Sequence, residues 1–181
     1  MTAADVLEII GRLDRAGIRW WIHGGWGMDA LLGEETRPHD DLDLAVARDD
    51  IERLEASLSD FRRVPERDEW PASFVVADAR DRQIDIHPIR LDERGNGWQE
   101  RRNGKEVMWS RGDLAGRGRI NDYEVRCTSP EFEARSHLYP GHDDVDRRDL
   151  ERLCERFGLE PPASPWPGTI HPKRVRARPS T

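Results

Sequence analysis

Apolar residues recur along this chain with two spacings, one typical of helices and one typical of strands. Between residues 2 and 16 they fall every three or four positions, which is the spacing of one helix face. Thr2 can cap this helix, and Gly17 ends it. The next segment, residues 18–23, is short and mostly apolar, as expected for a buried strand. The chain therefore begins with a helix followed by a strand.

Further along, the pattern predicts that strands and helices alternate. A short helix over residues 25–32, ended by Gly33, leads through a polar loop to a strand over residues 41–47. Asp49 can cap the next helix, which runs to about residue 59. Strands are also expected at 61–64, 73–77, 83–89 and 123–127, a hairpin with loops at 92–118, and helices at 129–138 and 143–157. This mixture indicates the α/β (α+β) class, with a mixed, twisted sheet, helices packed on one face and a small helical C-terminal part.

The length of the chain and the composition of its end indicate one domain with a tail. A chain of 181 residues forms a core that buries ~70% of the surface of the unfolded chain. From residue 160 onward the sequence is rich in proline and basic residues and too poor in apolar residues to build a core. We therefore expect a domain over residues 1–158 and a Pro-rich, basic tail over residues 159–181.

Two carboxylates stand out in the strand predicted over residues 41–47. The side chains of a strand alternate between its faces, so Asp41 and Asp43 point to the same side. Two carboxylates so close together repel each other, and a cation between them removes that repulsion. Mg²⁺ suits such an oxygen-rich site, because the phosphates of a substrate supply its remaining ligands.

A turn of two glycines precedes this pair. Gly24 and Gly25 carry no Cβ, so their N–H groups can approach a phosphate, and the N-terminus of the helix that follows adds positive potential. Arg37 and His39 lie just before the carboxylates. Taken alone, a Gly-Gly turn or an alternating aspartate pair is more often structural. Together they indicate a site for a nucleotide and a metal.

The same stretch resembles the signature of the nucleotidyltransferase superfamily that shares the polymerase-β-type fold. Within it, the stretch is similar to the small antibiotic-inactivating adenylyltransferases of the lincosamide and aminoglycoside types. The matching residues are Gly24, Gly25, Trp26, Asp29, Gly33, Arg37, His39, Asp41 and Asp43. Similar segments follow at 84–89 (IDIHPI, closer to the lincosamide branch), 126–131 and 146–150. The resemblance covers residues 5–158, is poor over 91–118, and is more specific for the fold and the reaction than for the acceptor.

The resemblance implies roles for three carboxylates on a nucleotidyltransferase fold. Asp41, Asp43 and Asp85 would be its catalytic residues and metal ligands, with Mg²⁺ as the metal and ATP as the nucleotide donor. Asp85, on a strand expected beside Asp43, is the natural general base, because the hydroxyl of an acceptor is a poor nucleophile at neutral pH. The alternative is a structural Asp85 bonded to an arginine such as Arg80 or Arg82.

Four residues are candidates for binding the nucleotide: Gly24, Gly25, Arg37 and His39. Arg37 suits the β- and γ-phosphates, since a guanidinium binds phosphate oxygens in a bidentate manner, and the alternative is an exposed loop residue. His39 either contacts the triphosphate or orients the loop through its imidazole hydrogen bonds.

Other polar and aromatic residues also have two interpretations. His87 resembles a residue of the lincosamide enzymes, although a lone strand histidine is more often structural. Asp146 and Asp149, on the last predicted helix, either face the nucleotide or only cap the helix and pair with Arg147 and Arg148. Trp70 and Trp109 are candidates to line a cleft for the acceptor.

The net charge, the apolar segments and the cysteines indicate which kinds of partner and which compartment suit this protein. The net charge of −7 argues against a nucleic-acid partner, which requires a positive footprint, and favours a cationic acceptor. No segment is long and apolar enough to span a membrane, and the first ten residues do not resemble an export signal. Cys127 and Cys154 form no metal-ligand or disulfide pattern, which fits a reducing cytoplasm.

The sequence therefore predicts an enzyme that transfers AMP from MgATP to a hydroxyl of a small antibiotic-like molecule and so inactivates it. The IDIHPI segment favours a lincosamide over an aminoglycoside. Two other classes stay open: a minimal nucleotidyltransferase of a toxin–antitoxin pair that modifies a protein, and a non-catalytic nucleotide-binding module. A homodimer is possible, because so small a domain can complete its acceptor site from a second subunit.

Overall fold

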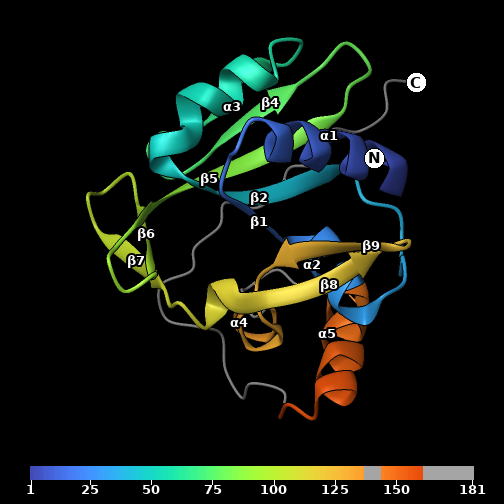
Figure 1. The fold of residues 1–181 in the computed structure, drawn as a ribbon. Coiled ribbons are helices and arrows are strands. Elements are labelled where there is room, and N and C mark those ends of the chain that lie inside the picture. Colours follow the sequence, from blue (N-terminus) through green and yellow to red (C-terminus); the bar gives the residue numbers. More distant parts are fainter. Residues whose placement is uncertain (137–143, 161–181) are drawn as a thin grey trace.

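The strands form one mixed, twisted sheet in the computed structural model, which describes residues 1–136 and 144–160 (Figure 1). The strands are β1 (Trp20–His23), β2 (Asp41–Ala47), β3 (Arg62–Asp68), β4 (Phe74–Ala77), β5 (Gln83–Leu91), β6 (Gly97–Glu100), β7 (Glu106–Trp109), β8 (Gly116–Ile120) and β9 (Tyr123–Cys127). They are arranged in the order β3-β4-β5-β2-β1-β9-β8, and the β6–β7 hairpin continues from β5. The β2–β5 and β1–β9 pairs are parallel and the other pairs are antiparallel, so the predicted mixed sheet is confirmed.

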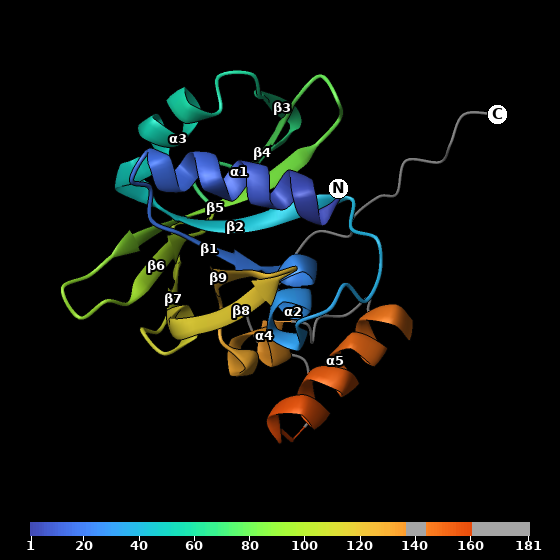
Figure 2. The ribbon, with the colours of Figure 1, turned by 45° about the vertical axis from the view of Figure 1, so that its right-hand side comes forward.

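The helices are α1 (Ala3–Arg15), α2 (Gly24–Leu32), α3 (Ile51–Ser57), α4 (Pro130–Ser136) and α5 (Asp144–Phe157), with 3₁₀ turns η1 (Arg48–Asp50) and η2 (Asp113–Ala115). In Figures 1 and 2, α1 and α3 lie over β2 and β5, while α5 lies beside α2 and α4 as a small helical C-terminal part. The helices and one face of the sheet share a single apolar cluster, to which β2 contributes Leu42 and Leu44. The opposite face of β2 carries Asp41 and Asp43, because side chains alternate along a strand.

Local signals at the helix ends are mostly confirmed. Thr2 caps α1, and Gly17 follows it with a φ of 67°. Ser129 caps α4 by accepting from the N–H of Phe132. The prediction that Asp49 caps the third helix is wrong: the turn η1 comes first, and no side chain caps α3.

The buried Asp50 takes part in that turn in a different way. It accepts hydrogen bonds from the guanidinium groups of Arg19 and Arg53, and the bonds from Arg19 hold the pKa of Asp50 below its usual range. This carboxylate therefore joins η1 to the residue that precedes β1 instead of capping α3.

The strand β8 lies in a segment that was expected to form only a hairpin and loops. Its sequence, GRGRI, looks like a loop because glycine is unfavourable in strands. Here the glycines allow close packing: a Cβ on Gly116 would overlap the carbonyl of Thr128, and one on Gly118 would overlap the backbone of Ala30 in α2. The helix α2 thus lies directly on β8.

The two cysteines are buried and unpaired with each other, as expected. Burial raises the pKa of the Cys127 thiol to about 12, so it is inert at neutral pH. Among the described residues, no helix has the length and apolar character needed to cross a membrane. The end of the helix predicted at 129–138, and the tail from residue 161, lie outside the described residues.

Deleting residues 161–181 should lower the melting temperature by only a few degrees. This segment is too poor in apolar residues to bury much surface, so the loss should be ~1 kcal/mol or less. Thermal unfolding of the truncated chain is the measurement. A longer truncation from residue 151 is the control, because it removes the fully buried Leu153 and should cost at least ~2–5 kcal/mol. Wholesale unfolding of the shorter truncation would contradict the prediction.

Candidate active site

Adjacent strands bring the predicted carboxylates together. In the parallel β2–β5 pair, Asp43 lies opposite Asp85 and Asp41 lies opposite Gln83, so the expectation that Asp85 lies beside Asp43 is confirmed. His23, at the end of β1, lies opposite Asp43 in the antiparallel β1–β2 pair. Asp41 is buried, while Asp43 and Asp85 are partly exposed. The site therefore lies on the face of the sheet opposite the large apolar cluster.

A group of three side chains has the composition of a metal site. Ligand atoms of Asp43, Asp85 and His87 all lie within 4.8 Å of one another. Carboxylate oxygens are the ligands that Mg²⁺ prefers, and imidazole is a weaker match for it. The donor set therefore fits a divalent cation held mainly by the aspartates, with Asp41 on the same face of β2.

Arg67 of β3 also lies beside these carboxylates, and no motif in the sequence had indicated it. Its Nη2 lies 3.6 Å from Oδ2 of Asp41 and 3.5 Å from Oδ2 of Asp85, and its Nη1 donates to Gln83 at 2.7 Å. The edge strand was expected to end at residue 64 and continues to Asp68. A guanidinium in this place offsets part of the repulsion between the acids.

The arginines considered as alternative partners of Asp85 lie elsewhere. Arg80 and Arg82 instead form ion pairs with Glu8 of α1 and with Asp78. Arg80 and Arg82 are therefore not the partners of Asp85, and the alternative of an Asp85 paired with an arginine now rests on Arg67.

The glycine turn is packed against the candidate site residues. Gly24 has a φ of 66°, in the left-handed region that glycine tolerates best, and a Cβ there would overlap Oδ2 of Asp43. A Cβ on Gly25 would overlap the imidazole ring of His39. The two glycines therefore let the start of α2 approach Asp43 and His39 closely, at the helix end where N–H groups lack intrahelical partners.

His39 is buried and held by an aspartate of α2. Its Nε2 lies 2.5 Å from Oδ2 of Asp29, whose other oxygen accepts from both the N–H and the hydroxyl of Thr36. This network connects the polar loop before β2 to the helix that begins at the glycine turn. Of the two interpretations of His39, the orientation of the loop therefore has a direct structural basis, and contact with a triphosphate remains a hypothesis.

Arg37 lies in the same loop and forms an ion pair with α5. Its Nε donates to Oδ2 of the buried Asp149 at 3.0 Å. Asp149 thus pairs with Arg37 across the fold, which neither interpretation of that residue had anticipated. The side chain of Asp146 lies outside the part of the structure that is described.

A buried glutamate beneath the glycine turn was also missed. Glu133 of α4 accepts from the hydroxyl of Thr128 and from the N–H of Gly24, and it lies close to Gly27. Burial raises the pKa of Glu133 to about 8. A glutamate in a polar helix gives no sequence signal of burial, because Gly24 and Gly27, against which it packs, come from a distant segment.

The raised pKa of Glu133 predicts a pH-dependent stability. The unfolded carboxyl has a pKa of 4.5, so the folded state binds the proton more tightly, and stability present below pH 4.5 is lost as the pH rises through about 8. Between about pH 6 and pH 9, the melting temperature of the parent should fall several degrees more than that of Glu133→Gln, since ~1 kcal/mol corresponds to about 2–4 °C. Thermal unfolding of both proteins across this range is the test, and parallel curves would contradict it.

The two candidate cleft tryptophans differ in their surroundings. Trp109 is buried, with its ring 4.4 Å from that of Phe132 and 5.3 Å from that of His23. It therefore forms part of the wall beside the carboxylates. Trp70 is 42% exposed and lies under the guanidinium groups of Arg48 and Arg63.

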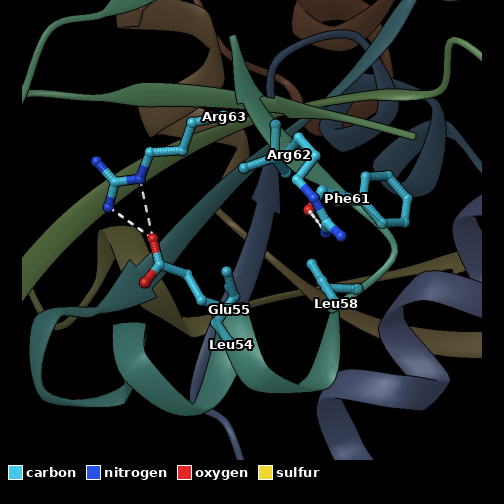
Figure 3. Close-up of a pocket in the computed structure, with 7 residues that line it drawn as sticks. Leu54, Glu55, Leu58, Phe61, Arg62 and Arg63 are labelled. Carbon is cyan, nitrogen blue, oxygen red and sulfur yellow. Dashed lines mark hydrogen bonds and ion pairs between the residues drawn. The ribbon is translucent and has the colours of Figure 1, made fainter. Parts of the chain in front are cut away.

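A pocket of ≈ 240 Å³ lies between α3 and β3 (Figure 3). It is lined by Leu54, Glu55, Leu58, Phe61, Arg62, Arg63 and Val76. In Figure 3 the guanidinium of Arg63 points toward Glu55, to which it donates at 2.9 and 2.7 Å. None of the candidate site residues lines this pocket, so it adds nothing to the site.

Residues 5–153 match the aminoglycoside-2''-adenylyltransferase family. The chain belongs to this family. The matched range includes the glycine turn, all three carboxylates, and the Arg37–Asp149 pair.

Two groups of curated relatives are similar to the chain. A lincosamide resistance protein of Staphylococcus haemolyticus is 24% identical over 153 residues, which cover 84% of this chain and 94% of that protein. A 2''-aminoglycoside nucleotidyltransferase of Klebsiella pneumoniae is 31% identical over 133 residues, 73% of this chain and 70% of that protein. The chain is thus similar to proteins named for either class of antibiotic.

Solved structures confirm the nucleotidyltransferase fold. The lincosamide antibiotic adenylyltransferase LnuA, bound to lincomycin, aligns with a TM-score of 0.76 at 22% identity and covers 84% of this chain and 96% of its own. ANT(2'')-Ia in complex with adenylyl-2''-tobramycin aligns with a TM-score of 0.70 at 24% identity, over 86% of this chain and 89% of its own. The predicted fold, with its mixed sheet and small helical C-terminal part, is therefore correct.

Proposed function

We propose that this protein transfers AMP from MgATP to a hydroxyl of a small antibiotic-like molecule and thereby inactivates it. The observation that carries the proposal is the pairing of Asp43 with Asp85 beside the glycine turn that begins α2. Two carboxylates on neighbouring strands repel each other, and a bound cation that also holds a triphosphate would offset this repulsion.

Asp41, Asp43 and Asp85 would hold the metal. When bound, Mg²⁺ orients the triphosphate and screens its charge. The N–H of Gly24 is engaged by Glu133, so phosphate binding at the turn falls to Gly25 and the N–H groups that follow it in the first turn of α2.

Two polar residues of the loop before β2 would assist this binding. Arg37, which is partly exposed, is the candidate for the β- and γ-phosphates and would exchange part of its contact with Asp149 for them. His39 would contact the triphosphate at Gly25, or hold the loop that does so.

The reaction assigned to the site is a single displacement at the α-phosphorus. The acceptor oxygen forms a bond to that phosphorus, the bond to the bridging oxygen breaks, and pyrophosphate leaves. Asp85 takes the hydroxyl proton as the oxygen attacks. The products are the adenylylated acceptor, pyrophosphate and the proton held on Asp85.

A lincosamide is favoured over an aminoglycoside as the acceptor. The chain spans nearly the whole length of the lincosamide resistance protein, whereas its match to the aminoglycoside enzyme covers less of either chain. The IDIHPI segment, which lies on β5, supports the same choice. A net charge of −7 suits a cationic acceptor of either class. We also propose a cytoplasmic protein that is able to form a homodimer.

A screen of acceptors tests the proposal. Purified protein is incubated with MgATP, or with another nucleoside triphosphate, and with lincosamides and aminoglycosides in parallel. Pyrophosphate release and the mass of the antibiotic are measured. A nucleotidyl mass increase on a lincosamide is the expected result. An increase only on the protein itself or on a co-purified protein would favour the toxin–antitoxin class, and no transfer to any hydroxyl would refute the proposal.

A further inference from the structure

A buried glutamine contacts the histidine nearest to Asp85. Gln99 of β6 is 1% exposed, and its Nε2 donates to the carbonyl of Ala72 at 2.7 Å. The same Nε2 lies 3.1 Å from Nδ1 of His87, which is itself buried on β5. The glutamine thus joins the β3–β4 connection to the strand that carries Asp85.

These contacts determine which ring nitrogen of His87 carries the proton. A backbone carbonyl only accepts hydrogen bonds, so the Gln99 atom beside Ala72 must be the amide nitrogen and not the oxygen. That nitrogen has two hydrogens, and the second is directed at Nδ1 of His87. Nδ1 must therefore accept, and the proton of the neutral ring lies on Nε2.

The protonated nitrogen faces the proposed general base. Nε2 of His87 lies 3.5 Å from Oδ1 of Asp85, while the ring of His23 packs edge-on against that of His87 with centroids 4.6 Å apart. A distance of 3.5 Å is long for a hydrogen bond, and such contacts commonly shorten when the substrate complex forms. A ring nitrogen that carries a proton has no lone pair for a metal, so this tautomer excludes His87 as a ligand in the Asp43–Asp85–His87 group.

We propose that Gln99 and His87 are positioning residues for Asp85. Gln99 imposes the Nε2–H tautomer, and His87 donates this hydrogen to Oδ1 of Asp85. The carboxylate is thereby held through Oδ1, which leaves Oδ2, beside Arg67, to take the proton of the acceptor hydroxyl. The inference rests on the proposed function for the role of Asp85, whereas the tautomer itself rests only on the hydrogen bonds of Gln99.

The opposite tautomer conflicts with this geometry. It would place a hydrogen on Nδ1 against the hydrogens of the Gln99 amide, and two donors cannot satisfy each other. Rotating the amide would instead place its oxygen against the carbonyl of Ala72. Either change leaves buried polar groups unsatisfied, which is costly.

Nuclear magnetic resonance reports the tautomer directly and needs no turnover. A long-range ¹H–¹⁵N spectrum is recorded at about pH 8, above the ordinary histidine pKa of about 6.5. The His87 signals are assigned by their loss in His87→Gln. We expect a protonated Nε2 and an unprotonated Nδ1, unchanged on addition of MgATP. A protonated Nδ1, or a switch to it with MgATP, would overturn the proposal and make His87 a ligand.

Kinetics of Gln99→Met then test the positioning role. This variant keeps the size of the side chain and removes the donor, so His87 should populate both tautomers. We expect kcat to fall ~10-fold or more, with KM for ATP and the affinity for MgATP near the parent values. His87→Gln, which keeps an N–H donor, should retain more activity than His87→Phe.

Unchanged kcat in a Gln99→Met protein of lower melting temperature would show a purely structural glutamine and would refute the positioning role. If the parent protein transfers nothing to any acceptor, the proposed function fails, and the positioning role fails with it. The spectrum still decides the tautomer in that case. The two failures are therefore distinguishable.

Discussion

An Asp43→Asn variant is expected to lose nucleotide transfer while remaining folded. Asp43 faces Asp85 across paired strands and lies directly against Gly24, so its carboxylate is central among the groups that would hold Mg²⁺. Asparagine has nearly the same shape and lacks the charge. A bound metal supplies several kcal/mol of charge stabilisation, and ~1.4 kcal/mol corresponds to tenfold in rate, so the loss should be ~10³-fold or more.

The stability of this variant has a predicted sign. Without divalent cations, its melting temperature should equal or exceed that of the parent, because one of the neighbouring like charges has been removed. With Mg²⁺ and ATP present, only the parent should gain stability, since a ligand stabilises the state that binds it. Thermal unfolding in chelator and in MgATP measures both effects.

Asp40→Asn is the matched control. Asp40 is exposed and lies just before β2. Its replacement by asparagine removes one carboxylate charge close to the site, as the Asp43 substitution does. Its transfer rate should stay near that of the parent. Undiminished activity of the parent in excess chelator, or equal losses in the Asp40 and Asp43 variants, would contradict the metal site.

The central part of the fold was predictable because its signals are local. The period of two places Asp41 and Asp43 on one face whatever the rest of the chain does. The strand that carries Asp85 was expected beside Asp43, and the structure confirms this pairing. Thr2 and Ser129 act on the helix that each precedes, so sequence alone identifies them as caps.

Residues whose roles depend on distant partners were not predictable. In the sequence, Glu133 is one more acidic residue of a polar helix. Its burial is evident only from its contacts with Thr128 and with the Gly24 N–H in the folded protein. Arg67 lies on an edge strand of mostly exposed residues, which has no apolar alternation to reveal its extent. The role of Gln99 depends on its contacts with Ala72 and His87, which are 27 and 12 residues away in the chain.

The acceptor is the least predictable feature for a physical reason. The residues on which the resemblance rests lie around the proposed nucleotide and metal site, where the same transfer chemistry is needed whatever the acceptor is. Trp109 and Phe132 form an apolar wall beside the carboxylates. An apolar surface does not by itself specify one ligand, because specificity comes mainly from a few placed polar groups. The preference for a lincosamide therefore rests on similarity over the whole chain and stays a proposal.

Asp85→Asn is expected to slow the chemical step by ~10²–10⁴-fold, the usual range for a lost general base. Asp85 lies between two different neighbours, with His87 3.5 Å from Oδ1 and Arg67 3.5 Å from Oδ2. Asparagine keeps the size of the side chain but cannot take a proton from an acceptor hydroxyl. If Asp85 acts mainly as the base, the affinity for MgATP should remain close to that of the parent.

Two other roles for Asp85 predict different results. If Asp85 is mainly a metal ligand, the Asp85→Asn variant should bind MgATP more weakly, and added Mg²⁺ should partly restore its rate. As a structural partner of Arg67, its loss should lower the melting temperature and leave near-normal turnover in the molecules that stay folded. The three roles therefore differ in which measured quantity changes.

Calorimetric titration of MgATP beside single-turnover kinetics separates these roles in one variant. Asp81→Asn is the matched control, because Asp81 is an exposed aspartate just before β5 whose φ of 60° asparagine also tolerates. It should change neither affinity nor rate. A slow chemical step with unchanged MgATP affinity supports the base, because only the proton acceptor is then missing. Near-normal turnover of Asp85→Asn would end that assignment, since a neutral amide cannot replace a carboxylate base.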